Sequence, residues 1–498
     1  MALLAVAGHT ALTSTSAALE TLERAGESSG TEAAQPLLSL KVARGEDLFG
    51  DWSRYPHDFA LYGPLTYVLP GLIGRAMGWD GPRIWLAGRF LSLLAGGLVL
   101  FLAAVVVRRQ GARVWLVVLG VLLLVPVLRI WNIAVTFRPD MPAIALSLLG
   151  LVLARGGSRT ALWRSLPFFL AALAFKQTAL AAPTAVGAAL YLDGRRREAL
   201  LFCVAGGLMA LGAVAALAAA THGFFLTHTF GILAASPCSS EWILNNWHTF
   251  LRVAPPAVLP GFAFGAQALR GRSEARPLAL ASGFSLLIAT LTSVRVGSDV
   301  NYFVEAIVYL VVLAILGTDD WLRRAASGAR LGPRLIATGL ALTACLISAD
   351  RSGPSRFPAP PSSSFSTAVP YFRQLTADLG TQQIFPGDVS LAVLADLPHP
   401  YSDGFAADYL TKAGRLRSAE LVGHVREAKY GYVLLPEMPI RYRGIAFLPD
   451  ALSRDLLLRF DLDHAEVLEP PGGRARFLLL RPRGGTPPVP IRADGRRP

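Results

Sequence analysis

Apolar residues come in long runs over the first 350 positions of this chain, separated by short polar stretches. A helix of about twenty apolar residues crosses a bilayer, and fewer suffice where neighbouring helices shield the ends. The runs therefore predict membrane-spanning helices, at residues 85–107, 114–133, 141–154, 199–220, 249–269, 277–294, 302–317 and 333–349.

Three further apolar stretches do not fit a simple span. Residues 162–192 are apolar on both sides of Lys176, which predicts two short helices meeting at a polar turn. Residues 1–18 are diluted by Ser and Thr and predict a weak or truncated first span, with a signal-anchor as the alternative. Residues 61–78 predict a segment that lies along the membrane interface or dips into the membrane and returns.

The composition agrees with a membrane protein. Hydrophobic residues make up 53% of the 498 positions and charged residues 16%, and the mean hydropathy is +0.45. The net charge of +13 lies largely in arginines of short loops between apolar runs. Such loops set membrane topology, so no nucleic-acid partner is expected.

The arginine-bearing loops predict the orientation. If the spans alternate, the loops at 108–113, 155–164, 195–197, 270–276 and 323–334 fall on one side of the membrane. The positive-inside rule makes that side cytoplasmic. A bacterial inner membrane is the expected location, and the opposite, periplasmic face then carries residues 19–84, the turns near 138, 176 and 298, and everything after position 350.

The chain changes character near position 351. A Pro/Ser-rich linker at 351–366 precedes mixed apolar runs that predict short strands at 389–394, 430–435 and 477–481, with helices near 368–380 and 417–428. The predicted fold class is thus mostly α, a polytopic helical membrane domain followed by a small extramembrane α/β domain. Its expected parts are a first span at 1–18, a first external loop at 19–84, a helical domain at 85–350, the linker, an external domain at 367–483 and a disordered tail at 484–498.

Ionisable residues gather at the external ends of the apolar runs. Ionisable groups near hydrocarbon are costly, so each one suggests a functional site. Together they predict a polar chamber for a charged lipid or sugar. The residues are Arg138, Asp140, Lys176, Arg295, Asp299 and Glu305, with Asn301 and Tyr302 between the last two.

The first external loop adds acidic, basic and aromatic side chains ahead of an apolar, Pro-started segment. Such a loop holds a carboxylate near the bilayer surface and offers aromatic faces to a sugar ring. The candidates are Glu32, Asp47, Asp51, Asp58, Tyr55, His57 and Tyr62.

The order of these features resembles the GT-C class of membrane glycosyltransferases, in particular its family 39-like and Rgt-like bacterial branch. The matching stretches, which cover roughly residues 20–350, are the loop from Arg44 to Tyr67, Arg138-Pro-Asp140, Phe175 to Pro183 and Gly297 to Glu305. The resemblance implies transfer of a sugar from a polyprenyl-phosphate carrier to an envelope acceptor on the external face. It implies no nucleotide-sugar at the site, and a GT-C-like fold.

The resemblance also implies roles. An acidic residue of the first loop serves as base or orients the attacking hydroxyl, and Glu32 is the first candidate, with Asp51, Asp47 and Asp58 as alternatives. Here the family's acidic pair is replaced by Thr31-Glu32. An exposed residue at a helix start is the structural alternative for Glu32.

The basic residues suit the leaving group. Lys176, Arg138 and Arg295 are candidate phosphate contacts, because a cation offsets the charge that grows on a departing polyprenyl phosphate. Asp140 is expected to orient Arg138 or bind sugar hydroxyls, and a simple Arg138–Asp140 pair at the interface remains the alternative.

Glu305 follows Asn301 by four residues, so both fall on one helix face, with Tyr302 beside them. A carboxylate one turn inside the membrane must face protein or water. Glu305 is expected to pair with Arg295 or Lys176, or to bind the sugar; a purely structural ion pair is the alternative.

Two rival functions remain open. A glycolipid transporter or flippase would use the same charged face, although transporters often show internal repeats and charges at mid-membrane. A non-catalytic glycolipid-binding protein is the other. No cofactor is assigned, because no dedicated metal-ligand set is apparent, and a divalent metal stays an open alternative.

Overall fold

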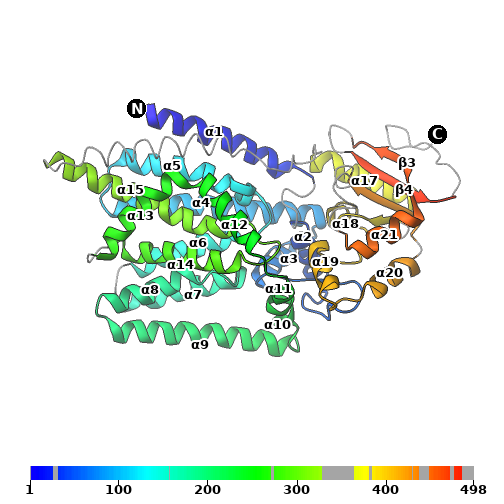
Figure 1. Cartoon of the computed structure of the whole chain (residues 1–498), viewed down its shortest axis with the longest axis horizontal. Coiled ribbons are helices and arrows are strands. Elements are labelled where there is room, and N and C mark those ends of the chain that lie inside the picture. Colours follow the sequence, from blue (N-terminus) through cyan, green and yellow to red (C-terminus); the bar gives the residue numbers. More distant parts are fainter. Residues whose placement is uncertain are drawn as a thin grey trace.

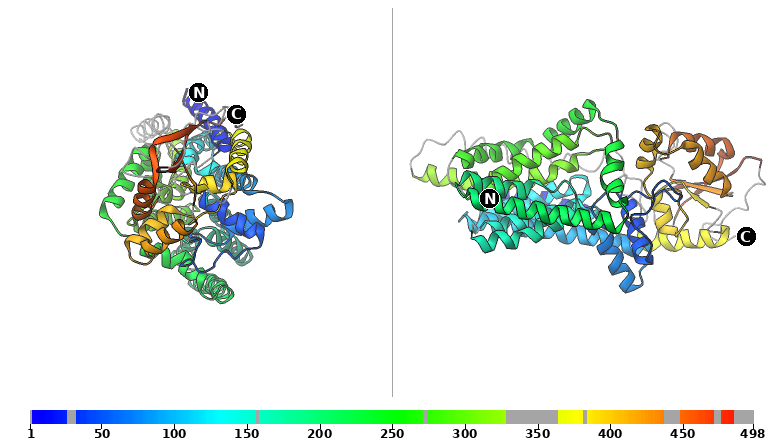
Figure 2. Two further views of the ribbon diagram at one scale, coloured as in Figure 1. Left: turned by 90° about the vertical axis from the view of Figure 1, so that its right-hand side faces the viewer. Right: turned by 90° about the horizontal axis from the view of Figure 1, so that it is seen from below.

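The computed structural model is elongated, with a helical bundle at one end and an α/β domain at the other (Figures 1 and 2). It describes residues 2–25, 32–155, 158–270, 274–327, 364–380, 384–428, 430–436, 448–470 and 476–484. The predicted span at 333–349, most of the linker and all but the first residue of the tail lie outside these ranges.

Apolar helices lie roughly side by side in the bundle (Figure 1). Long helices of the described part include α1 (Ala2–Glu23), α4 (Gly81–Arg109), α9 (Arg196–Ala220) and α15 (Val304–Ala326); between them come α5 (Val114–Arg129), η1 (Ile130–Val135), α6 (Asp140–Ala154), α7 (Arg159–Phe175), α8 (Ala181–Leu192), α12 (Ser240–Val253), α13 (Pro255–Arg270), α14 (Arg276–Thr292) and η3 (Val300–Phe303). Within the described residues, three segments are long and apolar enough to cross a membrane, namely Gly81–Arg109, Arg196–Ala220 and Val300–Ala326.

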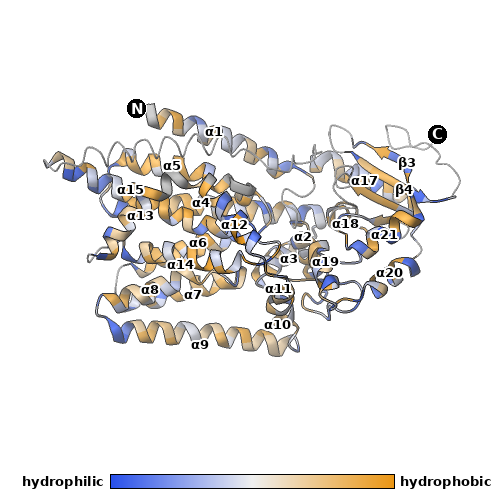
Figure 3. Cartoon of the chain, viewed as in Figure 1, coloured by the Kyte–Doolittle hydropathy of each residue, from blue (hydrophilic) through white to orange (hydrophobic). Residues whose placement is uncertain are grey.

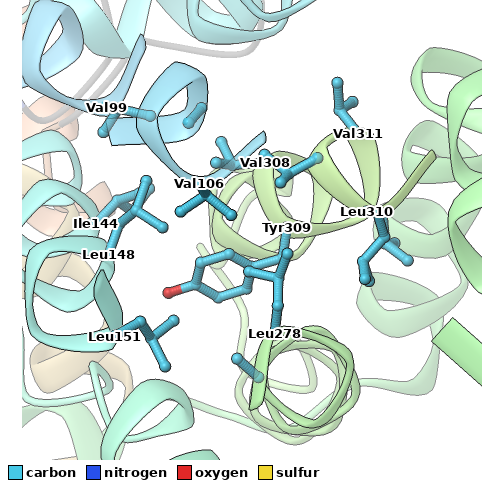
Figure 4. Close-up of a cluster of buried hydrophobic side chains, with 14 of the residues drawn as sticks. Val99, Val106, Ile144, Leu148, Leu151, Leu278, Val308, Tyr309, Leu310 and Val311 are labelled. Atoms are coloured by element: carbon cyan, nitrogen blue, oxygen red, sulfur yellow. The ribbon is translucent and has the colours of Figure 1, made fainter. Parts of the chain in front are cut away.

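α15 forms the centre of the bundle. Its side chains from Val304 to Leu316 are all buried except that of Glu305, and they pack against α5, α13 and α14. Figure 4 shows Val308 of this helix beside Val106, and the Tyr309 ring extending toward Leu148 and Leu151. A helix that is apolar all round is expected in such a position.

α1 and α9 lie on opposite flanks (Figures 1 and 2). α1 extends the weak first span predicted for 1–18 to Glu23 and packs mainly on α5. α9 buries only 6% of its most apolar window and leaves Leu200, Leu208 and Leu211 more than 60% exposed. Such an apolar surface suits contact with lipid tails.

Two sequence predictions for the bundle differ from the structure in detail. The predicted span at 249–269 is two helices, because α12 ends at Val253 and Pro255 starts α13. The predicted pair within 162–192 is confirmed: α7 ends at Phe175 and α8 begins at Ala181, with Lys176 in extended backbone between them.

The described parts of the arginine-bearing loops lie at the bundle end remote from the α/β domain. Contacts join them to one another: Arg155 donates to Glu274 at 2.8 Å, and Arg323 donates to the carbonyl of Gly111. Figure 3 shows hydrophilic residues at this end of α9 and α15. The predicted common side is therefore confirmed, while its assignment to the cytoplasm stays a prediction.

The C-terminal domain has a four-stranded sheet in the order β1-β2-β4-β3. β1 and β2 are parallel, and the other neighbours are antiparallel. The elements are α17 (Phe365–Leu379), β1 (Ile384–Pro386), α18 (Val389–Ala395), α19 (Gly404–Lys412), α20 (Ser418–Glu427), β2 (Tyr432–Pro436), α21 (Asp450–Arg459), β3 (Phe460–Leu468) and β4 (Phe477–Pro482).

In this domain α17, α20, β2 and β4 match the helices predicted near 368–380 and 417–428 and the strands predicted at 430–435 and 477–481. In contrast, β1, α19, α21 and β3 were not predicted, and the strand predicted at 389–394 was wrong. That segment is the buried helix α18, started by Asp388, whose side chain accepts a hydrogen bond from the Ser390 N–H. A short apolar run that is buried on every side carries no periodicity that separates a strand from a helix.

The first loop joins the two ends of the molecule. It contains α2 (Ala34–Arg44) and α3 (Leu65–Met77), which pack on each other. At about 1.5 Å per residue, α3 is too short to span a bilayer alone, in keeping with the predicted interfacial segment. Apolar residues of α2 and α4 pack with those of α17 and α18, and the Trp85 and Phe365 ring centroids are 5.6 Å apart.

Candidate functional site

Three separate segments of the bundle meet at Asp140, the first residue of α6. Its carboxylate accepts hydrogen bonds from Lys176 Nζ at 2.6 Å, from Asn301 Nδ2 at 3.0 Å and from Arg138 Nε at 3.2 Å. Asp140 is 1% exposed as a side chain, whereas Lys176 and Arg138 retain 11% and 13%. The cations are therefore nearer the surface of the cluster than the carboxylate that holds them.

Local backbone breaks put these residues in place. Lys176 follows the last residue of α7, and its N–H still bonds to the Ala172 carbonyl. Arg138 lies in the turn between η1 and α6, where Ser92 of α4 donates to its carbonyl at 3.5 Å. Because each helix ends or begins at this level, its polar side chains can converge without entering the apolar core.

A cavity of about 30 Å³ adjoins the ion-pair cluster. Such a volume admits one or a few water-sized groups. Asp140, Lys176, Asn301, Tyr302 and Glu305 supply its polar walls together with Thr178 and Ser285, and its apolar walls are Ala143, Ile144, Ala179, Ile288 and Ala289.

Glu305 lines this cavity and has neutral hydrogen-bond partners. Its carboxylate accepts hydrogen bonds from Tyr309 Oη at 2.8 Å and from Ser285 Oγ at 3.2 Å. The predicted ion pair of Glu305 with Arg295 or Lys176 is not formed among the described residues. The sequence did not single out Ser285 or Tyr309, because neither interrupts the apolar pattern of its helix.

Among the described residues, the hydrogen bonds of Arg295 go to the backbone of the bundle and not to Asp140. Its guanidinium donates to the carbonyls of Ala234 and Ser236, each at 3.1 Å. It thus ties the turn before η3 to the end of α11 (Leu233–Ala235), which follows α10 (Phe224–Leu226) and the π-helical η2 (Thr227–Ile232).

The aromatic residues of the chamber come from two segments. The Lys176 ammonium lies 4.4 Å from the Tyr302 ring centroid, a cation–π distance. Tyr62 of the first loop accepts a hydrogen bond from Arg138 at 3.4 Å. Burial raises the pKa of Tyr62 to about 12, despite the nearby charge of Arg138. Tyr62 is therefore neutral at physiological pH and available as a hydrogen-bond donor.

The first loop approaches Lys176 closely. Gly63 donates to the Phe175 carbonyl at 3.2 Å, and a Cβ at Gly63 would lie 2.2 Å from the Ala174 carbonyl oxygen. Gln177 donates to the Leu61 carbonyl at 3.0 Å. A glycine at position 63 is thus needed for the loop to pack on the end of α7.

Glu32, the first candidate for the base, lies in a closed ion pair. Its carboxylate accepts from Arg89 Nε at 2.7 Å, Trp85 Nε1 at 3.0 Å and the Phe137 N–H at 2.8 Å, and neither Glu32 nor Arg89 is exposed as a side chain. Glu32 is absent from the cavity walls described above. It instead fixes the backbone next to Arg138, and the alternative of an exposed helix-start residue was wrong.

The other acidic candidates of the first loop differ in environment. Asp47 is exposed, and Asp51 is held by Arg54 at 3.0 Å and by Ser53. Asp58 is buried between Lys41 at 2.5 Å and His399 at 3.1 Å. Burial opposes ionisation of Asp58, but His399 and Lys41 outweigh it and lower its pKa.

Tyr55 and His57 contact the C-terminal domain instead of the ion-pair cluster. Tyr55 Oη lies 3.2 Å from Tyr430 Oη, and the backbone of His57 pairs with the segment at Tyr401. Sequence reasoning did not predict this docking, because its partners lie more than 300 residues away. Arg89 was also missed, although a charge within the apolar run at 85–107 is itself a signal.

Comparison with known proteins identifies the fold. The crystal structure of ArnT from Cupriavidus metallidurans bound to undecaprenyl phosphate is similar, with a TM-score of 0.54, 14% identity, and coverage of 95% of this chain and 98% of that one. An Archaeoglobus fulgidus oligosaccharyltransferase tethered with an acceptor peptide has a TM-score of 0.46 and 12% identity, covering 95% of this chain and 73% of that one. No family model and no curated protein sequence matches the chain. The likeness to ArnT shows a polytopic membrane protein of GT-C-like fold.

Proposed function

We propose that this chain, as a membrane protein of GT-C-like fold, is a glycosyltransferase that takes a sugar from a polyprenyl-phosphate carrier. The acceptor would be an envelope lipid, glycan or protein hydroxyl on the external face, and the reaction inverting. The observation that carries the proposal is the pair of cations, Lys176 and Arg138, held by one carboxylate at the bundle end that faces the C-terminal domain. The undecaprenyl phosphate bound by ArnT supports a donor of this class.

The proposed chemistry follows from charge. As the acceptor oxygen attacks the anomeric carbon, the bond from that carbon to the phosphate oxygen breaks and negative charge grows on the phosphate. Lys176 and Arg138 would stabilise this charge, since preorganised cations act most strongly in a water-poor site. The polyprenyl tail would lie among the apolar helices, and the phosphoryl group already activates the sugar.

The acceptor hydroxyl must lose its proton, and a carboxylate suits that task. The contacts of Glu32 support a positioning role, in which it fixes the turn that carries Arg138. We therefore propose that the base lies among Asp47, Asp51 and Asp58, with Glu32 as the fourth member of the test set. Asp58 would first have to leave Lys41 and His399, so Asp47 and Asp51 are the freer groups.

The test uses purified full-length protein in lipid with polyprenyl-phosphate sugars and an envelope extract as the source of acceptor hydroxyls, measuring release of free polyprenyl phosphate. Lys176→Ala is expected to lower release at least about tenfold, since a charge-assisted contact contributes on the order of 1.5–3 kcal/mol. Lys412→Ala, an exposed lysine of α19, is the matched control. Wild-type protein that releases no lipid, or a Lys176→Ala variant as active as wild type, contradicts the proposal.

The carboxylate panel uses Glu32→Gln, Asp47→Asn, Asp51→Asn and Asp58→Asn in the same assay. The base is the residue whose substitution abolishes release while leaving binding of bare undecaprenyl phosphate and thermal stability unchanged. A transporter or flippase remains the second candidate. It predicts movement of labelled lipid between leaflets without sugar release, and the position of the charges at one bundle end argues against it.

A further inference from the structure

Helix α19 of the C-terminal domain packs against the helical bundle at Gly297. The ring of Phe405 occupies the space beside Gly297, where a Cβ would lie 2.1 Å from Phe405 Cε1. Gly297 has φ +89°, which favours glycine. Arg415, which follows the end of α19, donates to the Gly231 carbonyl at 3.3 Å. These contacts seat α19 against the bundle turn that leads into η3.

Tyr409 lies one turn along α19 from Phe405, and the two ring centroids are 5.7 Å apart. Tyr409 is only 5% exposed, yet its hydroxyl has no hydrogen-bond partner among the described residues. A buried hydroxyl without a partner costs free energy that a folded protein normally avoids. The unpaired hydroxyl therefore points to a ligand that would complete it.

The surroundings of this hydroxyl belong to the chamber. Burial raises the pKa of Tyr409, and the nearby Asp403, Tyr62 and Tyr302 raise it further. Tyr62 is bonded to Arg138 and Tyr302 lies under Lys176, as described above. Phe405 of the same helix packs beside Gly297, in the turn that leads into Asn301 and Tyr302, so α19 approaches the chamber from the domain side.

Two more buried polar atoms around the chamber have no partner within the described part of the chain. They are Asn301 Oδ1, beside Asp140, and Gln177 Oε1, next to Lys176. Both are acceptors, whereas a tyrosine hydroxyl also donates. Three unpaired groups on three separate segments, η3, the α7–α8 turn and α19, fit a ligand with several hydroxyls.

We infer that Tyr409 is a sugar-contacting residue: α19 forms the outer wall of the chamber, and the Tyr409 hydroxyl bonds to a hydroxyl of the sugar on the polyprenyl phosphate. The inference rests on the proposed function and deepens it. In this arrangement one hydroxyl of the sugar would complete the hydrogen bonding of Tyr409, and the phosphate would meet Lys176. The C-terminal domain then takes part in choosing the sugar.

The test distinguishes contacts with the sugar from contacts with the phosphate. Full-length protein is titrated with bare undecaprenyl phosphate and with undecaprenyl phosphate carrying a neutral hexose, a pentose or an amino sugar. Tyr409→Phe removes only the hydroxyl, and Tyr371→Phe, a tyrosine of α17 near Glu466 and Glu469, is the matched control. Melting temperatures of all variants check the fold.

The expected result has two parts. Wild type binds at least one sugar-bearing lipid more tightly than the bare lipid, and Tyr409→Phe loses about three- to tenfold of that preference, the value of one hydrogen bond. Binding of the bare lipid stays unchanged in Tyr409→Phe. Tyr371→Phe behaves as wild type.

Three outcomes would overturn the inference: no sugar-bearing lipid binds wild type more tightly than the bare lipid, Tyr409→Phe keeps the full preference, or it loses affinity for the bare lipid to the same extent. The proposed function fails separately. Its failure would appear as equal binding of bare undecaprenyl phosphate by wild type and Lys176→Ala, whatever Tyr409→Phe does.

Discussion

Arg89 and Glu32 form a buried, two-pronged ion pair: Nε donates to one carboxylate oxygen at 2.7 Å and a terminal nitrogen to the other at 2.9 Å. The same guanidinium donates to the carbonyls of Thr21, Leu22 and Arg24 at the end of α1. One arginine of α4 thereby fastens the first helix and the first loop to the bundle.

Replacing Glu32 tests this structural role. Glu32→Gln leaves the Arg89 charge buried without its counter-ion, and removing one partner of a buried pair costs about 3–5 kcal/mol. We expect a marked fall in the melting temperature of the detergent-solubilised protein. Asp47→Asn, at an exposed site of the same loop, should leave it unchanged. A Glu32→Gln protein as stable as wild type but inactive would instead favour the base role.

Asp140 makes a different prediction, because it competes with any phosphate for the same two cations. Asp140→Asn removes charge-assisted hydrogen bonds worth on the order of 1.5–3 kcal/mol each, so the ligand-free protein should melt earlier. Added undecaprenyl phosphate should then raise the melting temperature more in Asp140→Asn than in wild type, because the phosphate takes the place of the carboxylate. A smaller ligand effect in the variant would argue against a shared site.

The buried His57 predicts a pH-dependent contact between the first loop and the C-terminal domain. Its Nδ1–H donates to the Trp52 carbonyl at 3.0 Å, and Nε2 has no partner among the described residues. Burial lowers the pKa of His57, with His424 acting in the same direction and Asp58 and Glu420 opposing it. The docked state therefore disfavours a second ring proton.

The sign follows from linkage. The unfolded pKa of histidine is about 6.5, so below that pH the undocked loop binds more protons than the docked one, and docking weakens as the pH falls. The protection of the His57 and Ser402 amides against hydrogen exchange, relative to the intrinsic rate at each pH, should fall between about pH 6.5 and 5 in wild type. His57→Gln should flatten this dependence, whereas His464→Gln, an exposed histidine, should not.

Compared with His57, Asp58 affects the docking of the first loop in a lower pH range. Its folded pKa is depressed, so its contribution is present above the unfolded value of about 3.9 and is lost as the pH falls through the folded pKa. Asp58→Asn should therefore weaken docking near neutral pH. Protection against exchange that does not change with pH in wild type would refute the roles assigned to His57 and Asp58.

Gly297 provides a steric test of the α19 contact. Gly297→Ala and Gly414→Ala both place a side chain at positive φ, at a strain of about 1–3 kcal/mol, but only position 297 meets a neighbour, the Phe405 ring. We expect Gly297→Ala to lower sugar transfer and Gly414→Ala to affect stability alone. Equal activities of the two variants would show that the seating of α19 is unimportant.

Sequence patterns predicted the elements whose surroundings are uniform. The spans, the break at Lys176 and the strand at Tyr432 all follow from local apolarity and its interruptions. The convergence of Asp140, Lys176 and Asn301 also followed, because charges at helix ends on one membrane side must share limited protein surface.

Other features depend on residues far apart in the sequence. From the sequence, Glu32 resembled a catalytic carboxylate. In the structure it pairs with Arg89, which lies 57 positions away in the chain. Leu391 and Val393 of α18 are buried wherever they point, so their apolarity could not separate helix from strand. Tyr409 carried no local signal, since its role depends on how α19 lies against Gly297.

The docking of the first loop has a consequence for how the protein is made. His399, the partner of Asp58, is synthesised 341 residues after it. Ser402, whose hydroxyl accepts a hydrogen bond from the Phe59 N–H, is synthesised 343 residues after Phe59. The bundle helices are therefore synthesised while the loop still lacks its cover. A nascent or truncated chain can present the cations of the site but not its outer wall, so the sequence order itself delays a finished chamber until synthesis is nearly over.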